Sequence, residues 1–425
     1  MKHKYLPALY AAASFSLLLG AGCSNDEPDG PQPEPGVKKK TILLYAVASN
    51  NLYSNLINDK QEIIKGVMEN NIDLSRNSIM VYEVVPNSME YGETPRLLEL
   101  LPSGNGEYEY VEVKQYDRSL YSTDPERISE VIDDVRVHHP SNTYGLVLWS
   151  HALGWSPFFS DRDLHPATKA NPVVPVSDNS SITVSKADLP LQYSFGSDTN
   201  SDTGYTDKID IDELADAIPD GMFEFIWIDA CMMSGIETVY ELRNKCDYFG
   251  GYPTEVYSPG MPYDLTIPYL MKEKADLVGC GKAFFDYYAN NTSPYLRTAT
   301  VAVIDMSVLD EMASFCKTNY AETGVPPTSG MDYYSGSQRV AYRFYDFGQY
   351  TLAKIALGNR PEAEQEFRQL LDKLVIYRDA TEREFTGREL NLEEYSGLSS
   401  HVYDPAQTGS AAEYYRTLDW YKAVY

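Results

Sequence analysis

Apolar residues form several short uninterrupted runs along the chain, and segments with helical periodicity lie between them. The clearest runs cover residues 42–48, 78–85, 144–150 and 223–229. A short run rich in aromatic and β-branched residues is typical of a strand buried on both faces, as in a parallel sheet. Asp124, followed by a proline, opens one of the helical segments in between. This alternation of strand and helix predicts an α/β fold.

The rest of the chain continues the pattern with one interruption. Residues 156–208 contain five prolines and many Ser, Asp and Asn residues without a sustained period, which predicts a long irregular loop. Helical spacing returns at 209–218. Further strands are predicted at 247–252 and 300–304, a short hairpin element at 108–113, and helices at 234–245, 265–272, 282–288, 308–316 and 362–378.

Two short motifs invite a metal interpretation, and neither pattern supports it. The segment 198–204 resembles a calcium loop, but its glycine comes one place late and no closing glutamate follows. An Asp/Asn/Gly-rich turn is the favoured interpretation. His138 and His139 are adjacent at a predicted helix end, where neighbouring side chains point apart, and no HxxxH or CxxC partner exists. No metal site is therefore predicted.

The N-terminus has the features of a secretory signal. Lys2 and Lys4 precede an apolar stretch at 8–19 that is too short to span a bilayer comfortably. Small residues then lead into Cys23, which resembles a bacterial lipoprotein cleavage site; a plain secreted protein is the alternative. Residues 23–40 begin as a polar, proline-rich stretch that predicts a disordered tether. We expect a lipid anchor at Cys23 and no membrane-spanning helix.

Charge and cysteine content narrow the class of protein. The formal net charge is −27, which argues against nucleic acid or an anionic membrane surface as a partner. Besides Cys23, four cysteines remain, an even number that permits disulfides in an exported chain. The apolar content of 43% is ample for a core, so disulfides are not required. We expect none at Cys231.

Two predicted strands end at residues that can carry chemistry. Cys231 lies where the run 223–229 gives way to a helix, and His151 directly follows the run 144–150. The carboxyl ends of parallel strands are where ligands gather in α/β sheets. A thiol needs a base or an imidazolium nearby to be a useful nucleophile at neutral pH. Cys231 is either a buried hydrophobic residue or, if the two strands are neighbours, half of a catalytic pair.

The two blocks also carry a resemblance. WSHALGW around His151, with IDACMMSGIETVYELRNKCDYFGGYPTEVYSPGMPYD from Cys231 onward, resembles the clostripain family of cysteine peptidases over residues 39–310, and more weakly to the C-terminus. The resemblance implies a caspase-like α/β/α sandwich with a mostly parallel sheet and a mixed helical C-terminal portion. The expected organisation is a signal peptide at 1–22, the tether at 23–40, a peptidase core at 41–330 and an extension at 331–425 packed on the core.

The resemblance also assigns roles. Cys231 is the implied nucleophile, His151 carries the proton, and the backbone N–H groups of Cys231 and Ala152 form the oxyanion hole. The family usually has glycine at the position of Ala152, and alanine restricts φ. A catalytically silent, surface-anchored binding protein that retains the caspase-like fold is the alternative.

Specificity and processing complete the expectations. Asp229 lies two residues before Cys231, so alternation along a strand places it on the same side as the nucleophile. We expect its carboxylate to line the pocket for a basic substrate side chain; the alternative is that it caps the following turn. The family cleaves after Arg or Lys, and Glu255 is a second candidate for binding such a side chain. Family members are cut between the histidine and the cysteine, which favours Lys169 and Lys186 here, although a passive insertion is the alternative. Some relatives bind calcium, but no ligands are predicted. The expected location is the bacterial cell envelope, facing the surface or the periplasm.

Overall fold

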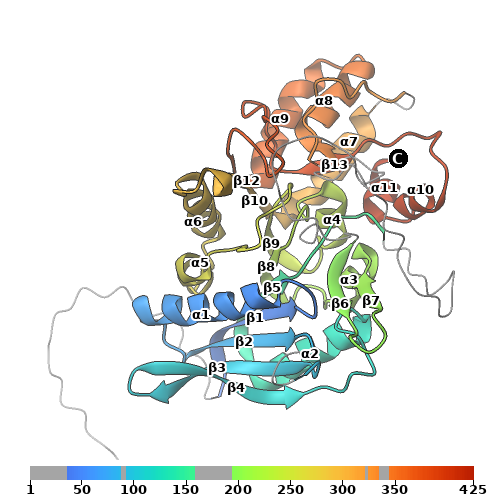
Figure 1. Cartoon of the computed structure of the whole chain (residues 1–425). Coiled ribbons are helices and arrows are strands. Elements are labelled where there is room, and N and C mark those ends of the chain that lie inside the picture. Colours follow the sequence, from blue (N-terminus) through green and yellow to red (C-terminus); the bar gives the residue numbers. More distant parts are fainter. Residues whose placement is uncertain (1–35, 88–91, 158–193, 321–323, 335–343) are drawn as a thin grey trace, which may run out of the picture.

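The computed structural model describes residues 36–87, 92–157, 194–320, 324–334 and 344–425. Nine strands form one sheet in the order β12-β10-β9-β8-β5-β1-β2-β3-β4 (Figure 1). The five central strands β9, β8, β5, β1 and β2 are parallel, and two antiparallel pairings extend each edge. The strands are β1 Lys38–Val47, β2 Asn77–Val84, β3 Arg96–Gly104, β4 Glu107–Gln115, β5 Ser141–Trp149, β8 Phe223–Asp229, β9 Cys246–Gly251, β10 Thr300–Asp305 and β12 Val375–Ala380.

Helices cover both faces of this sheet, so the molecule is an α/β/α sandwich of the caspase-like type that was predicted (Figure 1). One face packs against α1 Tyr53–Glu69, α5 Tyr263–Leu270 and α6 Leu277–Ala289. The other helices of the described residues contribute side chains to the cluster on the opposite face: α2 Pro125–His138, α3 Ile211–Ala217, α4 Ile236–Glu241, α7 Leu309–Asn319, α8 Phe347–Leu357, α9 Glu362–Leu374, α10 Ser410–Tyr415 and α11 Asp419–Val424.

The central strand β1 shows why its sequence is continuously apolar. Ile42 and Leu44 pack into the cluster under α1, whereas Leu43 and Tyr45 pack into the cluster on the opposite face. Side chains alternate between the faces of a sheet, so a strand covered on both sides needs apolar residues at every position. The run therefore predicts a central strand correctly.

The C-terminal part of the chain contributes to the sheet itself. The helix predicted at 362–378 ends at Leu374, and Val375–Ala380 becomes β12, which pairs antiparallel with β10. Two short strands, β11 Phe344–Asp346 and β13 Ser399–His401, form a separate antiparallel pair. In the described parts of the chain, no helix combines the length and the apolar character needed to cross a membrane.

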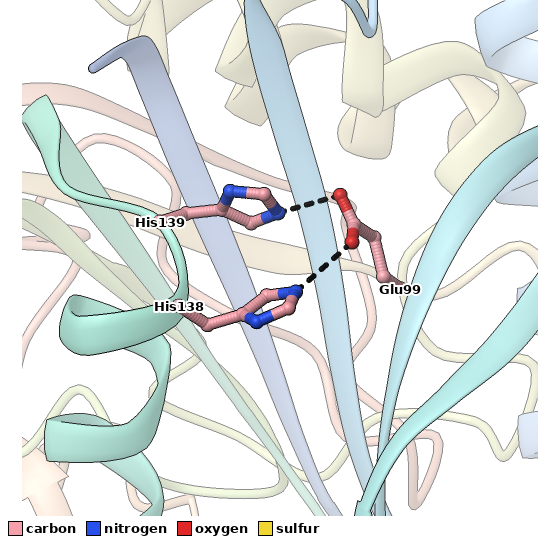
Figure 2. Close-up of side chains that lie close together, drawn as sticks. All are labelled: Glu99, His138 and His139. Atoms are coloured by element: carbon pink, nitrogen blue, oxygen red, sulfur yellow. Dashed lines mark hydrogen bonds and ion pairs between the residues drawn. The ribbon is translucent and has the colours of Figure 1, made fainter. Parts of the chain in front are cut away.

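Some sequence expectations about the fold are wrong. The predicted tether at 23–40 extends too far, because β1 begins at Lys38. The end of the predicted irregular loop folds into a hairpin of β6 Phe195–Thr199 and β7 Thr206–Ile209. Phe195 on β6 also forms an isolated bridge with Ala152 in the segment after β5. His138 and His139 do not point apart: their ring centroids are 4.5 Å from each other, and both rings contact Glu99 on β3 (Figure 2). The helix ends at His138, and His139 leaves it with φ −129° and ψ 83°, which turns the second ring toward the first.

Candidate active site

His151 and Cys231 lie at the ends of two strands that are direct neighbours. Strands β5 and β8 pair in parallel, and the last pair in register is Trp149 with Asp229. His151 and Cys231 each follow two residues beyond that pair, at the carboxyl edge of the sheet. Neighbouring strands are about 4.8 Å apart, so the two segments leave the sheet side by side. The expectation that these strands are adjacent is confirmed.

His151 is nearly buried and has a polar partner that the sequence reasoning missed. Its Nε2 atom lies 2.8 Å from Oδ1 of Asn51, which follows β1, the other neighbour of β5. Since the amide oxygen only accepts, Nε2 carries the proton in this contact and Nδ1 is the free basic nitrogen. Burial, and then the charge of Lys208, lower the pKa of His151 to about 4, so the ring is neutral.

Cys231 lies against the segment after β9. The backbone N–H of Val256 donates to Sγ at 3.4 Å, and the thiol lies 3.7 Å from the carbonyl oxygen of the same residue. Burial raises the pKa of the thiol to about 12, and the charges of Glu255 and Asp229 add to the effect. The resting pair is thus a neutral thiol and a neutral imidazole. Within the described structure, the side chains of His151 and Cys231 form no hydrogen bond with each other.

Two tight turns hold the histidine and cysteine segments against each other. Gly154 has φ +57°, and a Cβ atom there would meet the carbonyl oxygen of Met232 at 2.9 Å. Met232 itself has φ +63°, which costs a residue with a side chain about 1–3 kcal/mol. Its N–H donates to the carbonyl oxygen of Thr254 at 3.0 Å. Backbone strain of this kind clusters at active sites, so its presence directly after Cys231 is consistent with a catalytic segment.

The backbone N–H group of Ala152 is not used in pairing with β6. Ala152 forms a bridge with Phe195 in which Leu153 donates to Ser194 and Gly196 donates to His151. This is the pattern of a non-hydrogen-bonded antiparallel pair, so the N–H and C=O of Ala152 point away from β6. Among the described residues, Ala152 is not one of those with positive φ. Alanine in place of glycine is therefore accommodated without backbone strain.

Comparisons with known proteins agree with this geometry. The family model of the clostripain family, peptidase family C11, matches residues 44–170 and 194–424. The chain belongs to the clostripain family.

Solved structures of the same kind are similar over nearly the whole chain. One is an inactive zymogen C11 protease from Parabacteroides distasonis, with 26% identity, a TM-score of 0.71, and coverage of 92% of this chain and 100% of that one. A second is a secreted C11 cysteine protease from Bacteroides thetaiotaomicron, with 25% identity, a TM-score of 0.70 and coverage of 92% and 100%. The Bacteroides protease in complex with an irreversible peptide inhibitor shares the fold at 24% identity, a TM-score of 0.70, and coverage of 91% and 98%. No curated protein matches the chain significantly. The chain is thus a cysteine peptidase of the clostripain type.

The two carboxylates predicted for the substrate pocket differ in their surroundings. Asp229 is 4% exposed and accepts hydrogen bonds from the hydroxyls of Tyr252 and Tyr263 and from the N–H of Met261. Burial raises its pKa to about 6, against the effect of these bonds. Glu255 is half-buried beside the Cys231 thiol, and burial raises its pKa to about 7.

The prediction that Asp229 shares the nucleophile's side of the strand is wrong. The partners of Asp229 belong to the cluster under α1 and α5, whereas Cys231 packs against the cluster on the other face. The strand ends at Asp229 and the chain turns at once, so the period of two does not extend to Cys231. Gly260, at φ +61°, lies over the carboxylate, where a Cβ atom would be 2.9 Å from Oδ2.

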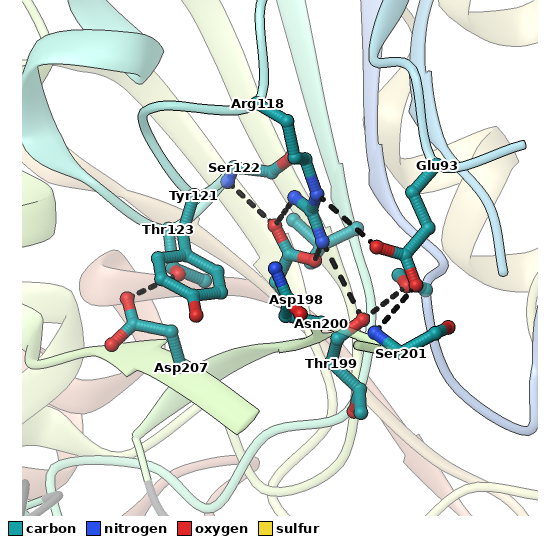
Figure 3. A network of polar contacts seen from close by, with 12 residues as sticks. Glu93, Arg118, Tyr121, Ser122, Thr123, Asp198, Thr199, Asn200, Ser201 and Asp207 are labelled. Carbon is teal, nitrogen blue, oxygen red and sulfur yellow. Dashed lines mark hydrogen bonds and ion pairs between the residues drawn. The ribbon is translucent and has the colours of Figure 1, made fainter. Parts of the chain in front are cut away.

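The turn between β6 and β7 is not built as a calcium loop (Figure 3). Both carboxylate oxygens of Asp198 bind the Arg118 guanidinium, at 2.7 and 2.6 Å, and one also accepts from the N–H of Ser122. Asn200 caps the turn by accepting from the N–H of Asp202 and Thr203. These groups fix the hairpin beside the His151 segment, as expected for an Asp/Asn/Gly-rich turn.

Three predicted residues lie outside the described residues: Cys23, Lys169 and Lys186. Cys231, Cys246, Cys280 and Cys316 are all free thiols. Cys246, Cys280 and Cys316 are buried, as is common for free cysteines, and none of these four residues forms a disulfide.

Proposed function

We propose that this cysteine peptidase is an extracytoplasmic endopeptidase that uses Cys231 and His151 and cleaves after Arg or Lys. The observation that carries the proposal is the pairing of β5 with β8, which puts both residues at one edge of the sheet two positions beyond the same register pair.

The chemistry follows from the neutral resting pair. Sγ of Cys231 forms a bond to the scissile carbonyl carbon while the thiol proton passes to Nδ1 of His151. The N–H groups of Ala152 and Cys231 stabilise the oxyanion. The C–N bond then breaks, the imidazolium gives its proton to the leaving amine, and water hydrolyses the thioester. Asn51 keeps the ring orientated by accepting from Nε2.

A group of three acidic residues near Asp229 supports the proposed preference for substrates with basic side chains. Asp229, Asp59 and Glu62 are close enough to affect one another. Burial, and then the charges of Asp229 and Glu62, raise the pKa of Asp59 to about 9. A guanidinium or ammonium entering this region would let Asp229 ionise and pair with it. Since Gly260 covers Asp229, the segment 256–261 must move to admit the side chain, and Glu255 lies at its near end.

We propose that the chain is made as a precursor and cut in the 156–208 segment after Lys169 or Lys186. The similar Parabacteroides protease was solved as an inactive zymogen. A cut before residue 194 would leave β6 bonded to the His151 segment and β5 paired with β8, so both pieces would stay together. Lys208 lies on β7, is 9% exposed, and is the poorest site for cleavage.

The main test uses a peptide that ends in Arg and carries an electrophile for the thiol. The wild-type protein should be labelled covalently, and Cys231→Ala should not. Cys246→Ala is the matched control, because it removes a buried thiol far from the site and should leave labelling intact. Labelling that is absent from the wild type would support the silent binding protein, and labelling that is equal after Arg and Leu would refute the specificity.

Processing is tested by following the mass of the purified protein. The wild type should split within residues 156–208 while Cys231→Ala stays whole. An uncut wild type with full activity would show that the segment is only an insertion.

Export and anchoring are proposed from the sequence alone. Lipidation needs Cys23 at the mature N-terminus, so Cys23→Ser should release the protein from the membrane fraction. The anchor is refuted if that variant sediments with membranes as the wild type does.

A further inference from the structure

The side chains of Glu99, His138 and His139 converge on one another (Figure 2). Nε2 of His139 lies 2.6 Å from one carboxylate oxygen of Glu99, and Nε2 of His138 lies 3.2 Å from the other. His138 ends α2 immediately before β5, whereas His151 follows β5 at its far end. The cluster is therefore separate from the peptidase site.

We propose that these three side chains form a binding site for a divalent transition-metal ion of the zinc class. Two imidazole nitrogens and one carboxylate oxygen are the donor set of many three-ligand zinc sites. Imidazole favours zinc, copper, nickel and iron over calcium and magnesium, which prefer oxygen ligands. The site is thus distinct in chemistry from any calcium site.

The geometry is close to what such an ion needs. The donor atoms all lie within 4.8 Å of one another. Two ligands of a tetrahedral zinc ion at 2.0–2.1 Å are about 3.4 Å apart. The distance from His138 Nε2 to Oε2 of Glu99 is already near this spacing, and the distance from His139 Nε2 to the other oxygen, Oε1, must widen by less than about 1 Å.

The scaffold holds Glu99 firmly and leaves an approach for the ion. Glu99 lies within β3, in register with Met80 on β2 and Val111 on β4, and its side chain is 9% exposed. The hydroxyl of Ser78 lies 3.3 Å from one carboxylate oxygen and can donate to it. The side chain of His138 is 39% exposed, so an ion can enter and keep water in its remaining positions. The C-terminal end of the 14-residue helix α2 also favours positive charge.

The ion would join a helix to a strand that is distant in the sequence, and its effect would be on stability. It would bind the folded chain and not the unfolded one, so it would raise the thermal midpoint. Without the ion, the same three residues form only a hydrogen-bonded contact.

The experiment titrates the full chain, carrying Cys231→Ala, with ZnCl₂ by calorimetry and with CoCl₂ by visible absorption. The Cys231→Ala background removes the active-site thiol as a competing ligand. One equivalent should bind, and the thermal midpoint should rise by several degrees and return with EDTA. His138→Gln and Glu99→Gln should each weaken binding at least tenfold.

The matched control is Glu112→Gln, which removes a carboxylate from the neighbouring strand β4 and should leave the affinity unchanged. His138 is partly exposed, so His138→Gln should fold even if Glu99→Gln does not. No binding, or binding that both variants retain, would overturn the proposal.

Discussion

The two ends of strand β5 use histidine in opposite ways. Before the strand, His139 and His138 bind the carboxylate of Glu99, and their bonds and charges outweigh burial and hold the pKa of Glu99 below its ordinary value. After the strand, His151 has an amide partner, Asn51, and burial holds its pKa near 4. The first arrangement stabilises charge, whereas the second keeps a neutral base. An ion pair of this kind stabilises the fold. An imidazole without a nearby negative charge stays unprotonated at neutral pH, so its basic nitrogen is available for the thiol proton.

The largest expected effect is at His151. His151→Ala should lower kcat/KM at least about 10³-fold, because the thiol loses its proton acceptor. The thermal midpoint should change by only a few degrees. The same substitution at His139 should act on the thermal midpoint instead. Measuring kcat/KM and the thermal midpoint of both His151→Ala and His139→Ala therefore distinguishes the roles of the two ends of β5. More than a tenth of wild-type activity in His151→Ala would contradict the comparison.

The next effect concerns Asp229. Asp229→Asn should lower kcat/KM for Arg and Lys substrates by about 10²-fold, because the cation loses a buried partner. In the wild type, a bound cation favours the ionised carboxylate, whose pKa is about 6 in the free protein. KM for Arg substrates should therefore fall as pH rises through 6, and Asp229→Asn should lack this dependence. A KM that does not change with pH in the wild type would show that Asp229 does not bind the basic side chain of the substrate.

Asn51 offers a smaller and more specific test. Asn51→Ala should lower kcat on the order of tenfold through loss of ring orientation. Asn51→Asp gives His151 the kind of partner that Glu99 provides at the other end, so the pKa of the imidazole should rise. The acidic limb of the kcat/KM profile should then move to higher pH. An unchanged profile would show that Asn51 does not position the ring.

The smallest effect is the stability contribution of Glu99. Its folded pKa is lowered, so its contribution is present above the unfolded pKa of about 4.3 and is lost as pH falls through the folded value. Glu99→Gln should lower the free energy of unfolding by about 1–2 kcal/mol at neutral pH. The difference should shrink as the pH falls below the unfolded pKa of about 4.3. Denaturant titrations in EDTA measure this. Glu112→Gln should change it by less than about 0.5 kcal/mol, and an equal loss in both variants would contradict a specific role.

The sequence alone determined the central strands of the sheet and the two strand ends that carry His151 and Cys231. Runs such as 42–48 and 223–229 are apolar at every position because both faces of the central strands are covered, so composition along the run reports burial directly. His151 and Cys231 were found for the same reason, since His151 follows such a run directly and Cys231 follows one after a single residue.

The tertiary structure decided what lies beside these residues. Asp229 turned to the other face because the strand ends there, and Asn51 reached His151 because β1 pairs with β5. Glu99 met two adjacent histidines because the helix ended between them. Each of these contacts joins residues from different elements and depends on where an element stops. Local periodicity does not encode such endings or the partners that follow from them, because packing across the whole sheet selects them.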